Sequence, residues 1–216
     1  IHVVEDAAHA LPTFYRGRMI GTIGDITCFS FYATKTITTG EGGMITTENN
    51  EMAERIKRLR LHGITKDAWN RYSEKGTWQY DVSEAGYKYN LTDIASAIGI
   101  EQLKKCDAMN AMRHEIADKY NSAFRGNELI ETWKVRSDKD CAWHLYPVRL
   151  NTGALSIDRD EFILRLKERG IGTSVHYIPM YRFSCFDGSG YKPADFPVCD
   201  DIFRRQVSLP IYPGMT

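Results

Sequence analysis

The sequence predicts an α/β fold, because short β-branched runs alternate with amphipathic helical segments in both halves of the chain. With 216 residues and 43% hydrophobic side chains, the chain can bury one large core or two smaller ones. A long helical pattern near the middle is of the kind that links two domains. The sequence therefore predicts two α/β parts joined by this helix.

Three short apolar runs predict strands in the first half of the chain, at residues 1–4, 25–31 and 43–47. The first of these strands is expected to be buried. Glycines within residues 17–24 predict a turn before the second strand.

A helix is predicted over residues 51–61, because its apolar residues recur at helical spacing and Asn49 or Asn50 can cap its start. Gly63 follows its end. Residues 64–89 are aromatic and polar without a clear period, which predicts a long functional loop.

Thr92 is suited to cap a helix that continues to Phe124 and ends at Gly126. Apolar residues keep helical spacing throughout this stretch, so a single helix is expected. The pattern beyond it predicts three strands and two helices, in chain order at 143–150, 158–169, 173–177, 200–206 and 207–211. Of the two helices, the first is expected to be capped by Asp158 and stopped by Gly170.

The net charge and the lengths of the apolar runs argue against two classes of partner, nucleic acids and membranes. Lys plus Arg is 28 and Asp plus Glu is 28, so the formal net charge is zero and no basic footprint for nucleic acid is present. No apolar run approaches the roughly 18 residues that a membrane span needs. We therefore expect no nucleic-acid partner and no membrane partner.

The cysteines indicate a reducing compartment. They are odd in number, widely scattered, and form neither a CxxC pair nor a zinc-ligand spacing: Cys28, Cys106, Cys141, Cys185 and Cys199. The simplest interpretation is reduced thiols in a cytoplasmic protein that holds no metal. The chain also starts inside an apolar run and stops without a final helix, which predicts a fragment of a longer polypeptide.

Lys35 stands in an unusual setting for a lysine. It follows the apolar run 29–31 and precedes the glycine-rich stretch 40–43, so its amine is expected in a sheltered place. A sheltered amine is a nucleophile that can form a Schiff base with a carbonyl. Asp6 follows another apolar run, so the two side chains are expected at neighbouring strand ends, where α/β sheets bind ligands.

A lysine and a sheltered carboxylate together match the needs of pyridoxal phosphate chemistry. The carboxylate of Asp6 would keep the pyridine nitrogen protonated, and Lys35 would hold the cofactor and shuttle a proton. The alternative for Asp6 is a loop carboxylate that caps a helix or pairs with an arginine.

Three further side chains are candidates for the same cofactor. Ser30 is placed to bind its phosphate, His9 to contact its phenolic oxygen, and Asn90 to help receive a phosphate before the Thr92 cap. Each also has an ordinary structural alternative: a strand serine, a capping histidine and an asparagine that shapes a turn.

Together these segments resemble the DegT–StrS family of nucleotide-sugar aminotransferases, which are fold-type I pyridoxal-phosphate enzymes. The resemblance covers essentially the whole chain. Its carriers are VEDAAHA at 4–10, FSFYATKTITTGEGG at 29–43, LHGI at 61–64, GYKYNLTD at 86–93 and SLPIYP at 208–213.

The resemblance implies a role for each candidate. Lys35 matches the Schiff-base lysine, Asp6 the pyridine-nitrogen acid, His9 a ring contact and Ser30 a phosphate ligand. Asn90 matches a contact to the cofactor phosphate of a neighbouring subunit, which implies a homodimer with shared active sites. The adjacent pair His176 and Tyr177 matches a region where relatives build the substrate pocket.

The resemblance also implies an activity and a domain division. An amino group would move from an amino acid, glutamate by expectation, to a keto group of a nucleotide-linked sugar in polysaccharide, lipopolysaccharide or glycan precursor synthesis. Residues 1–108 would be the C-terminal half of the large domain with the start of the connecting helix, and 109–216 most of the small domain. Relatives carry a further N-terminal part, so the alternative is a catalytically incomplete fragment or a regulatory scaffold.

Overall fold

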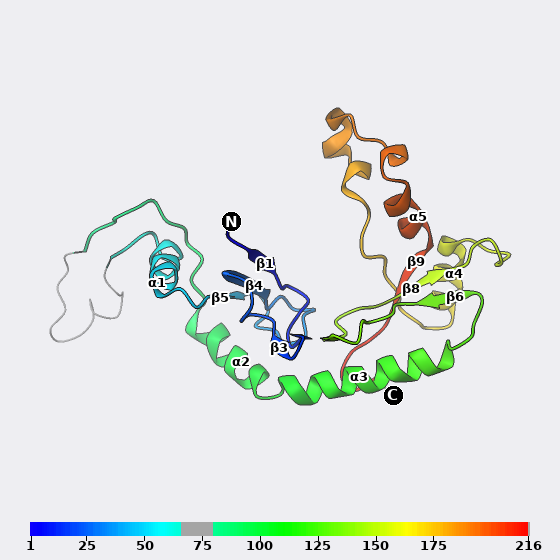
Figure 1. Ribbon diagram of the computed structural model, residues 1–216, viewed down its shortest axis with the longest axis horizontal. Coiled ribbons are helices and arrows are strands. Elements are labelled where there is room, and N and C mark those ends of the chain that lie inside the picture. The colour runs from blue at the N-terminus through cyan, green and yellow to red at the C-terminus, as the bar shows by residue number, and fades with distance from the viewer. Residues whose placement is uncertain (66–79, 216) are drawn as a thin grey trace. The chain divides into compact units, whose positions relative to one another are not determined.

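A computed structural model describes residues 1–65 and 80–215 of the chain (Figure 1). The chain divides into two compact units. The first unit comprises Ile1–Asp107 and Asp138–Cys141, and the second comprises Ala108–Ser137 and Ala142–Thr216. Their correspondence to the expected large and small domains stays a prediction.

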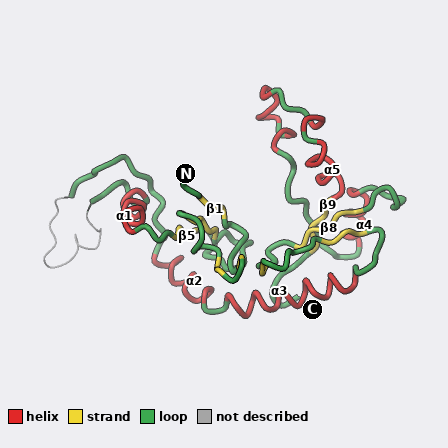
Figure 2. Tube along the Cα trace, in the orientation of Figure 1, coloured by secondary structure: helices red, strands yellow, loops and turns green. Residues whose placement is uncertain are grey.

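The first unit contains a three-stranded sheet in the order β1-β4-β5, with β1 at Val4–Asp6, β4 at Ile26–Ser30 and β5 at Gly43–Thr46 (Figure 2). Strand β1 runs parallel to β4, and β5 runs antiparallel to it. The two strands predicted at 25–31 and 43–47 are therefore confirmed, each slightly shorter than expected.

The strand predicted at residues 1–4 is wrong in its position and its burial. Strand β1 begins only at Val4, whose exposed fraction is 63%. The carboxylate of Asp25 accepts a hydrogen bond of 2.7 Å from Val3 N, so a side chain takes the N–H of this residue, while its carbonyl accepts from Asp25 N at 3.0 Å. Glu5 is the inward residue, because its Oε2 accepts from Thr27 Oγ1 at 2.6 Å.

Short strands that no sequence pattern indicated form a second sheet in the first unit. Its order is β3-β2-β7, with β2 at Phe14–Tyr15, β3 at Arg18–Met19 and β7 at Lys139–Asp140. Because each has two residues, none is long enough to show an alternating pattern. Strand β3 lies inside the predicted turn at 17–24.

Helix α1 spans Asn50–Leu59, and the predicted Asn49 cap is confirmed: its Oδ1 accepts from Met52 N at 3.0 Å. The predicted loop at 64–89 lies partly outside the described residues. In its described part, isolated bridges join Ile64 to Val82 and Leu61 to Lys88.

The single helix predicted from Thr92 to Phe124 is wrong, because the chain forms two helices. Helix α2 spans Asp93–Leu103 and α3 spans Cys106–Ala123. Thr92 caps α2 as expected, with its Oγ1 accepting from Ala95 N at 3.2 Å. At the junction Lys105 N donates to Gln102 O at 3.0 Å. This bond spans three residues, as in a 3₁₀ turn, and ends helix α2.

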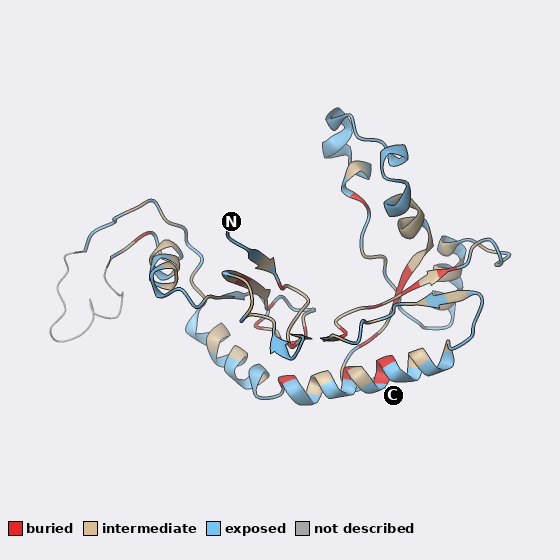
Figure 3. Ribbon diagram, viewed as in Figure 1, coloured by how far each residue is buried: buried red, intermediate tan, exposed pale blue. Residues whose placement is uncertain are grey.

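The second unit is built on an antiparallel sheet in the order β6-β8-β9, with β6 at Ile130–Thr132, β8 at Tyr146–Leu150 and β9 at Gln206–Leu209. Buried positions gather on β8, β9 and one side of α3 (Figure 3). The largest fully buried side chains of this core are Tyr146, Leu150, Val148 and Val207.

Two expected strands of the second unit need correction. The strand predicted at 143–150 begins only at Tyr146, because Trp143 has a left-handed backbone with φ +45°. The strand predicted at 173–177 is absent among the described residues, where one bridge joins Ser174 to Ser208. The strand predicted at 207–211 is present as β9, shifted toward the N-terminus.

Helix α4 spans Arg159–Glu168 and is capped as predicted, since Asp158 Oδ1 accepts from Glu161 N at 2.8 Å. Three short 3₁₀ helices follow, at Met180–Arg182, Ser184–Ser189 and Pro193–Asp195. Helix α5 spans Pro197–Arg205 and begins three residues before the predicted start, because Pro197 is suited to a first helical turn.

None of the described helices is both long and apolar enough to cross a bilayer. Among residues 1–65 and 80–215, no group of three or more His, Cys, Asp or Glu side chains is arranged to hold a metal ion. All five cysteines are free thiols.

Candidate functional site

The carboxyl ends of β1 and β4 form one edge of the first unit's sheet, and three candidate residues belong to it. Asp6 is the last residue of β1 and pairs in register with Cys28. Ser30 ends β4 two residues later. Because β1 and β4 are parallel and adjacent, the two residues that end them, Asp6 and Ser30, lie at the same end of the sheet, and the Lys35 loop follows β4 in the chain. Figure 1 labels the two strands.

Asp6 is exposed and organises the turn that follows it. Its Oδ1 accepts a hydrogen bond of 3.0 Å from Ala8 N, and Ala10 N donates to Ala7 O at 3.0 Å. This turn carries the half-buried His9. In the described part of the chain the second carboxylate oxygen, Oδ2, has no hydrogen-bond partner, so Asp6 both caps a turn and presents a carboxylate oxygen.

The Lys35 loop is closed by backbone hydrogen bonds. Thr39 N donates to Phe31 O at 3.0 Å, so the loop returns to its own start. Lys35 N donates to Tyr32 O at 2.9 Å, and the next two residues, Thr36 and Ile37, are buried at 7% and 4% exposure. The backbone of Lys35 is therefore fixed, while its side chain is half-buried.

Glycine is required where the chain leaves this loop. A Cβ added at Gly42 would lie 2.3 Å from Thr39 Oγ1 and 3.1 Å from Leu91 Cδ1. The backbone of Gly42 also accepts a 2.8 Å hydrogen bond from Phe31 N. The glycine-rich stretch after Lys35 thus serves close packing of the loop.

The same contact places Asn90, because its neighbour Leu91 lies beside Gly42. Asn90 is half-buried and stands two residues before the Thr92 cap of α2. At the other end of that helix, Gln102 Oε1 accepts from Thr38 N at 3.4 Å. Helix α2 therefore contacts the Lys35 loop, with Asn90 just before its first turn.

His176 and Tyr177 lie in the second unit, beside a cavity of about 710 Å³. One wall of the cavity is the segment 175–180, and the other comes from α5 and its flanks, including Phe203 and Gln206. Most of its lining side chains are apolar. The His176 ring meets Tyr177 edge-on, with centroids 4.9 Å apart. The structure thus puts the predicted residues in two groups, one in each unit.

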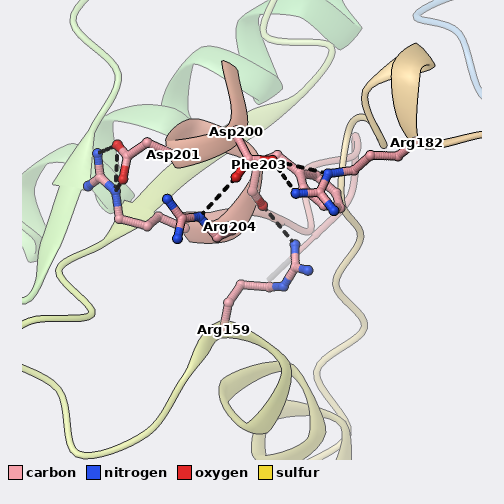
Figure 4. A network of polar contacts seen from close by, with 7 residues as sticks. Arg159, Arg182, Asp200, Asp201, Phe203 and Arg204 are labelled. Carbon is pink, nitrogen blue, oxygen red and sulfur yellow. Dashed lines mark hydrogen bonds and ion pairs between the residues drawn. The ribbon is translucent and has the colours of Figure 1, made fainter. Parts of the chain in front are cut away.

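Ion pairs and cation–π contacts join α5 to Arg159 and Arg182 (Figure 4). Asp200 pairs with Arg182 and with Arg204, the latter at 3.3 Å. The guanidinium groups of Arg159 and Arg182 lie over the Phe203 ring at 5.2 and 5.3 Å from its centroid. Such cation–π contacts join α5 to α4 and to the 3₁₀ helix Met180–Arg182.

A second carboxylate of α5 is held by its own helix. Asp201 accepts hydrogen bonds of 3.1 and 3.0 Å from Arg205 Nε, and these bonds lower the pKa of the Asp201 carboxyl. The hydrogen bond from Arg182 to the Asp200 carboxylate raises the pKa of the Arg182 guanidinium. Both acids of α5 are thus committed to arginines.

Comparison with known proteins adds to this geometry. The model of the DegT/DnrJ/EryC1/StrS aminotransferase family matches residues 1–216. The chain belongs to this family. The sequence-based recognition of the DegT–StrS group is therefore confirmed.

Two curated family relatives match along the whole chain. The uncharacterized protein MJ1066 of Methanocaldococcus jannaschii is 54% identical over 217 residues. The spore coat polysaccharide biosynthesis protein SpsC of Bacillus subtilis is 48% identical over 218 residues. Each match covers 100% of this chain and 56% of the relative, so the chain spans about half the length of these proteins.

Solved family structures confirm the α/β fold. Helicobacter pylori PseC, an aminotransferase involved in the biosynthesis of pseudoaminic acid, matches with a TM-score of 0.88 at 28% identity, over 100% of this chain and 56% of PseC. The sugar aminotransferase CalS13 of Micromonospora echinospora matches with a TM-score of 0.85 at 31% identity, over 100% and 55%. Spr1654 of Streptococcus pneumoniae matches in its PMP form with a TM-score of 0.89 at 32% identity, over 100% and 55%.

Sequence reasoning missed two side chains that contact His176. Ser208 Oγ lies 2.8 Å from His176 Nδ1, and Gln206 Nε2 donates to His176 O at 2.8 Å. The sequence indicates Ser208 only as part of SLPIYP and gives it no separate role. The available signal is a polar residue within the strand predicted at 207–211, because a polar group that becomes buried needs a partner.

Proposed function

We propose that this chain is the cofactor-holding part of a pyridoxal-phosphate-dependent sugar aminotransferase. Its activity is the transfer of an amino group from an amino acid, glutamate by preference, to the keto group of a nucleotide-linked sugar. The observation that carries the proposal is the common sheet edge of Asp6 and the Lys35 loop. The family and its solved sugar aminotransferases support it.

The residues at this edge fit the cofactor. Asp6 offers a carboxylate oxygen to the pyridine nitrogen, and the half-buried Lys35 is held by a fixed backbone for covalent attachment. Ser30 ends the adjacent strand and offers a hydroxyl to the phosphate, while His9 lies on the turn beside Asp6. When bound, pyridoxal phosphate withdraws electrons from the carbon that exchanges its amino group.

Asp6 and Lys35 then act in the proton transfers. Asp6 keeps a proton on the pyridine nitrogen through a charge-assisted hydrogen bond. The Lys35 Nζ atom moves a proton at the carbon that exchanges its amino group, as a general acid and base. The closed loop holds Lys35 at one place throughout, which is the positioning that such proton transfer needs.

The remaining roles belong to the acceptor and the assembly. His176 and Tyr177 bind the keto sugar, next to a cavity that accommodates a bulky group. Asn90 reaches the cofactor phosphate of a second copy, so the working form is a homodimer with shared sites. The setting is the cytoplasmic synthesis of polysaccharide, lipopolysaccharide or glycan precursors, in line with the name of SpsC, a spore coat polysaccharide biosynthesis protein.

Cofactor trapping tests the proposal directly. The purified protein is mixed with pyridoxal phosphate, its visible absorbance is recorded, and borohydride reduction is followed by peptide mass analysis. We expect a visible band and a reduced adduct on Lys35. An adduct spread over surface lysines, with no visible band, would instead favour a catalytically incomplete fragment or scaffold.

A further inference from the structure

The segment that carries His176 is fixed to strand β9 at three points. Ser174 and Ser208 exchange backbone hydrogen bonds of 3.2 and 2.8 Å. Gln206 Nε2 donates to the carbonyl of His176 at 2.8 Å, and Ser208 Oγ lies 2.8 Å from His176 Nδ1. Backbone, carbonyl and ring are therefore all held from one strand.

The burial of Ser208 decides the direction of the bond to the ring. Its exposed fraction is 4%, and within the described part of the chain its hydroxyl has no hydrogen-bond partner except His176 Nδ1. A buried hydroxyl that donates to nothing is costly. The Ser208 hydroxyl therefore donates to Nδ1, so the neutral His176 ring carries its proton on Nε2.

The His176 ring, held in this way by Ser208, lines two cavities. His176 lines the cavity of about 710 Å³ and also a smaller one of about 240 Å³, which Ser208 lines as well. The larger cavity is mainly apolar, and in such surroundings a single directed N–H group discriminates strongly between ligands. The chemical group that matches it is an acceptor oxygen, such as a carbonyl or a sugar hydroxyl.

We propose that Ser208 is a positioning residue that fixes His176 as an Nε2–H donor to an acceptor oxygen of the sugar substrate, an inference that rests on the proposed function. Ser208 itself does not touch the substrate. It acts by selecting one tautomer and one ring orientation, as hydrogen-bonded partners of histidine commonly do.

Nitrogen NMR of the imidazole tests the tautomer without any substrate. Spectra are recorded on the full chain at pH about 9, where histidines are neutral, and His176→Gln assigns the signals. We expect His176 Nδ1 to resonate as an acceptor nitrogen and Nε2 as a protonated one. Ser208→Ala should lose this single pattern and show a mixture of tautomers.

Two matched variants complete this experiment. Ser208→Thr keeps the hydroxyl, and the smaller cavity beside Ser208 has room for the added methyl group, so the wild-type pattern should return. Ser174→Ala removes an exposed hydroxyl from the paired segment and should change nothing. The inference is overturned if Nδ1 is protonated in the wild type, if Ser208→Ala keeps the wild-type pattern, or if Ser208→Thr behaves like Ser208→Ala.

Kinetics of the loaded enzyme give a second readout. Ser208→Ala should lower kcat/KM for the keto-sugar acceptor about tenfold, as expected for one misdirected neutral hydrogen bond, and leave the half-reaction with L-glutamate unchanged. An equal loss in both half-reactions would overturn the positioning role. If no wild-type transamination occurs, the proposed function fails, whereas the NMR result still decides the tautomer.

Discussion

The Lys35 edge in the first unit and the His176 region in the second are held in different ways. Around Lys35 the bonds nearest the lysine join backbone atoms, Thr39 N to Phe31 O and Lys35 N to Tyr32 O, and the Gln102 side chain adds a longer bond of 3.4 Å to Thr38 N. Around His176 they include side chains from a strand about thirty residues away, Gln206 and Ser208. A site held by its own backbone keeps its geometry when neighbouring side chains change, whereas one held by distant side chains is open to change at single positions.

The two units also differ in how they bury apolar groups. In the sheet of the first unit, Val4, Met44 and Ile45 are exposed at 63%, 53% and 46%. In the second unit, Tyr146, Val148 and Leu150 alternate inward on β8 with exposures of 1% or less. The second unit therefore has the stronger core of its own, and its local stability should be higher.

The largest expected effect on turnover comes from replacing Lys35, the central residue of the Lys35 edge in the first unit. Lys35→Ala should lower turnover at least about a thousandfold, because both covalent attachment and proton transfer need its amine. The visible cofactor band should disappear with it. Lys57→Ala, on the exposed face of α1 and paired with Glu54 at 2.7 Å, is the control and should retain both. Near-normal turnover without Lys35 would remove the catalytic assignment.

Asp6→Asn should have the next largest effect. An amide cannot hold a proton on the pyridine nitrogen, and the loss of one preorganised electrostatic partner costs about 2–4 kcal/mol, so kcat should fall about a hundredfold or more. The amide oxygen can still accept from Ala8 N, so the turn and the thermal midpoint should be kept. A decrease of only a few fold would leave Asp6 as a turn cap alone.

The contrast between the regions also explains what the sequence could predict. Ser30 ends β4 and Lys35 follows it, and this strand lies where its local apolar run predicts one. Strand β1, which ends at Asp6, begins later than its apolar run predicts. The break between Leu103 and Cys106 was not visible, because apolar residues keep helical spacing across it. The composition of segment 173–177 favours a strand, whereas its partners are set by tertiary contacts with Ser208 and Gln206.

Asn90 offers a test of whether the cofactor site at the Lys35 edge is formed by one copy of the chain or by two. An Asn90→Ala protein and a Lys35→Ala protein are each expected to be impaired. If Asn90 serves a neighbour's cofactor, mixing them forms heterodimers in which one site carries both lesions and the other carries none. Random exchange makes about half of the dimers mixed, so activity should return to about a quarter of wild type.

The mixing experiment needs proof of exchange. Native mass spectrometry with one isotopically labelled partner shows whether heterodimers form, and activity should rise only in step with them. If heterodimers form and no activity returns although Asn90→Ala alone is impaired, Asn90 acts within its own copy. The shared-site proposal would then be wrong, while the Lys35 and Asp6 roles would stand.

The smallest effect concerns the core of the second unit, through Tyr146. This side chain is 1% exposed, its hydroxyl donates to Asn121 Oδ1 at 2.7 Å, and burial raises its pKa from 10.0 to about 12. In the unfolded chain the phenol ionises at the lower value. Between pH 10 and about 12 the folded state therefore binds more protons, and the free energy of unfolding should fall by up to about 1.4 kcal/mol per pH unit.

Tyr146→Phe isolates this contribution. It removes the ionisable hydroxyl and keeps the ring that packs against Tyr120 and Trp143. The variant should be about 1 kcal/mol less stable near pH 7, where the hydrogen bond to Asn121 is lost. Its stability should then decline less steeply above pH 10, as measured by urea unfolding at several pH values. Tyr191→Phe, at an exposed tyrosine of the same unit, should follow the wild-type curve. If Tyr146→Phe shows the full alkaline loss, the buried phenol does not control it, and the second unit owes its alkaline sensitivity to other groups.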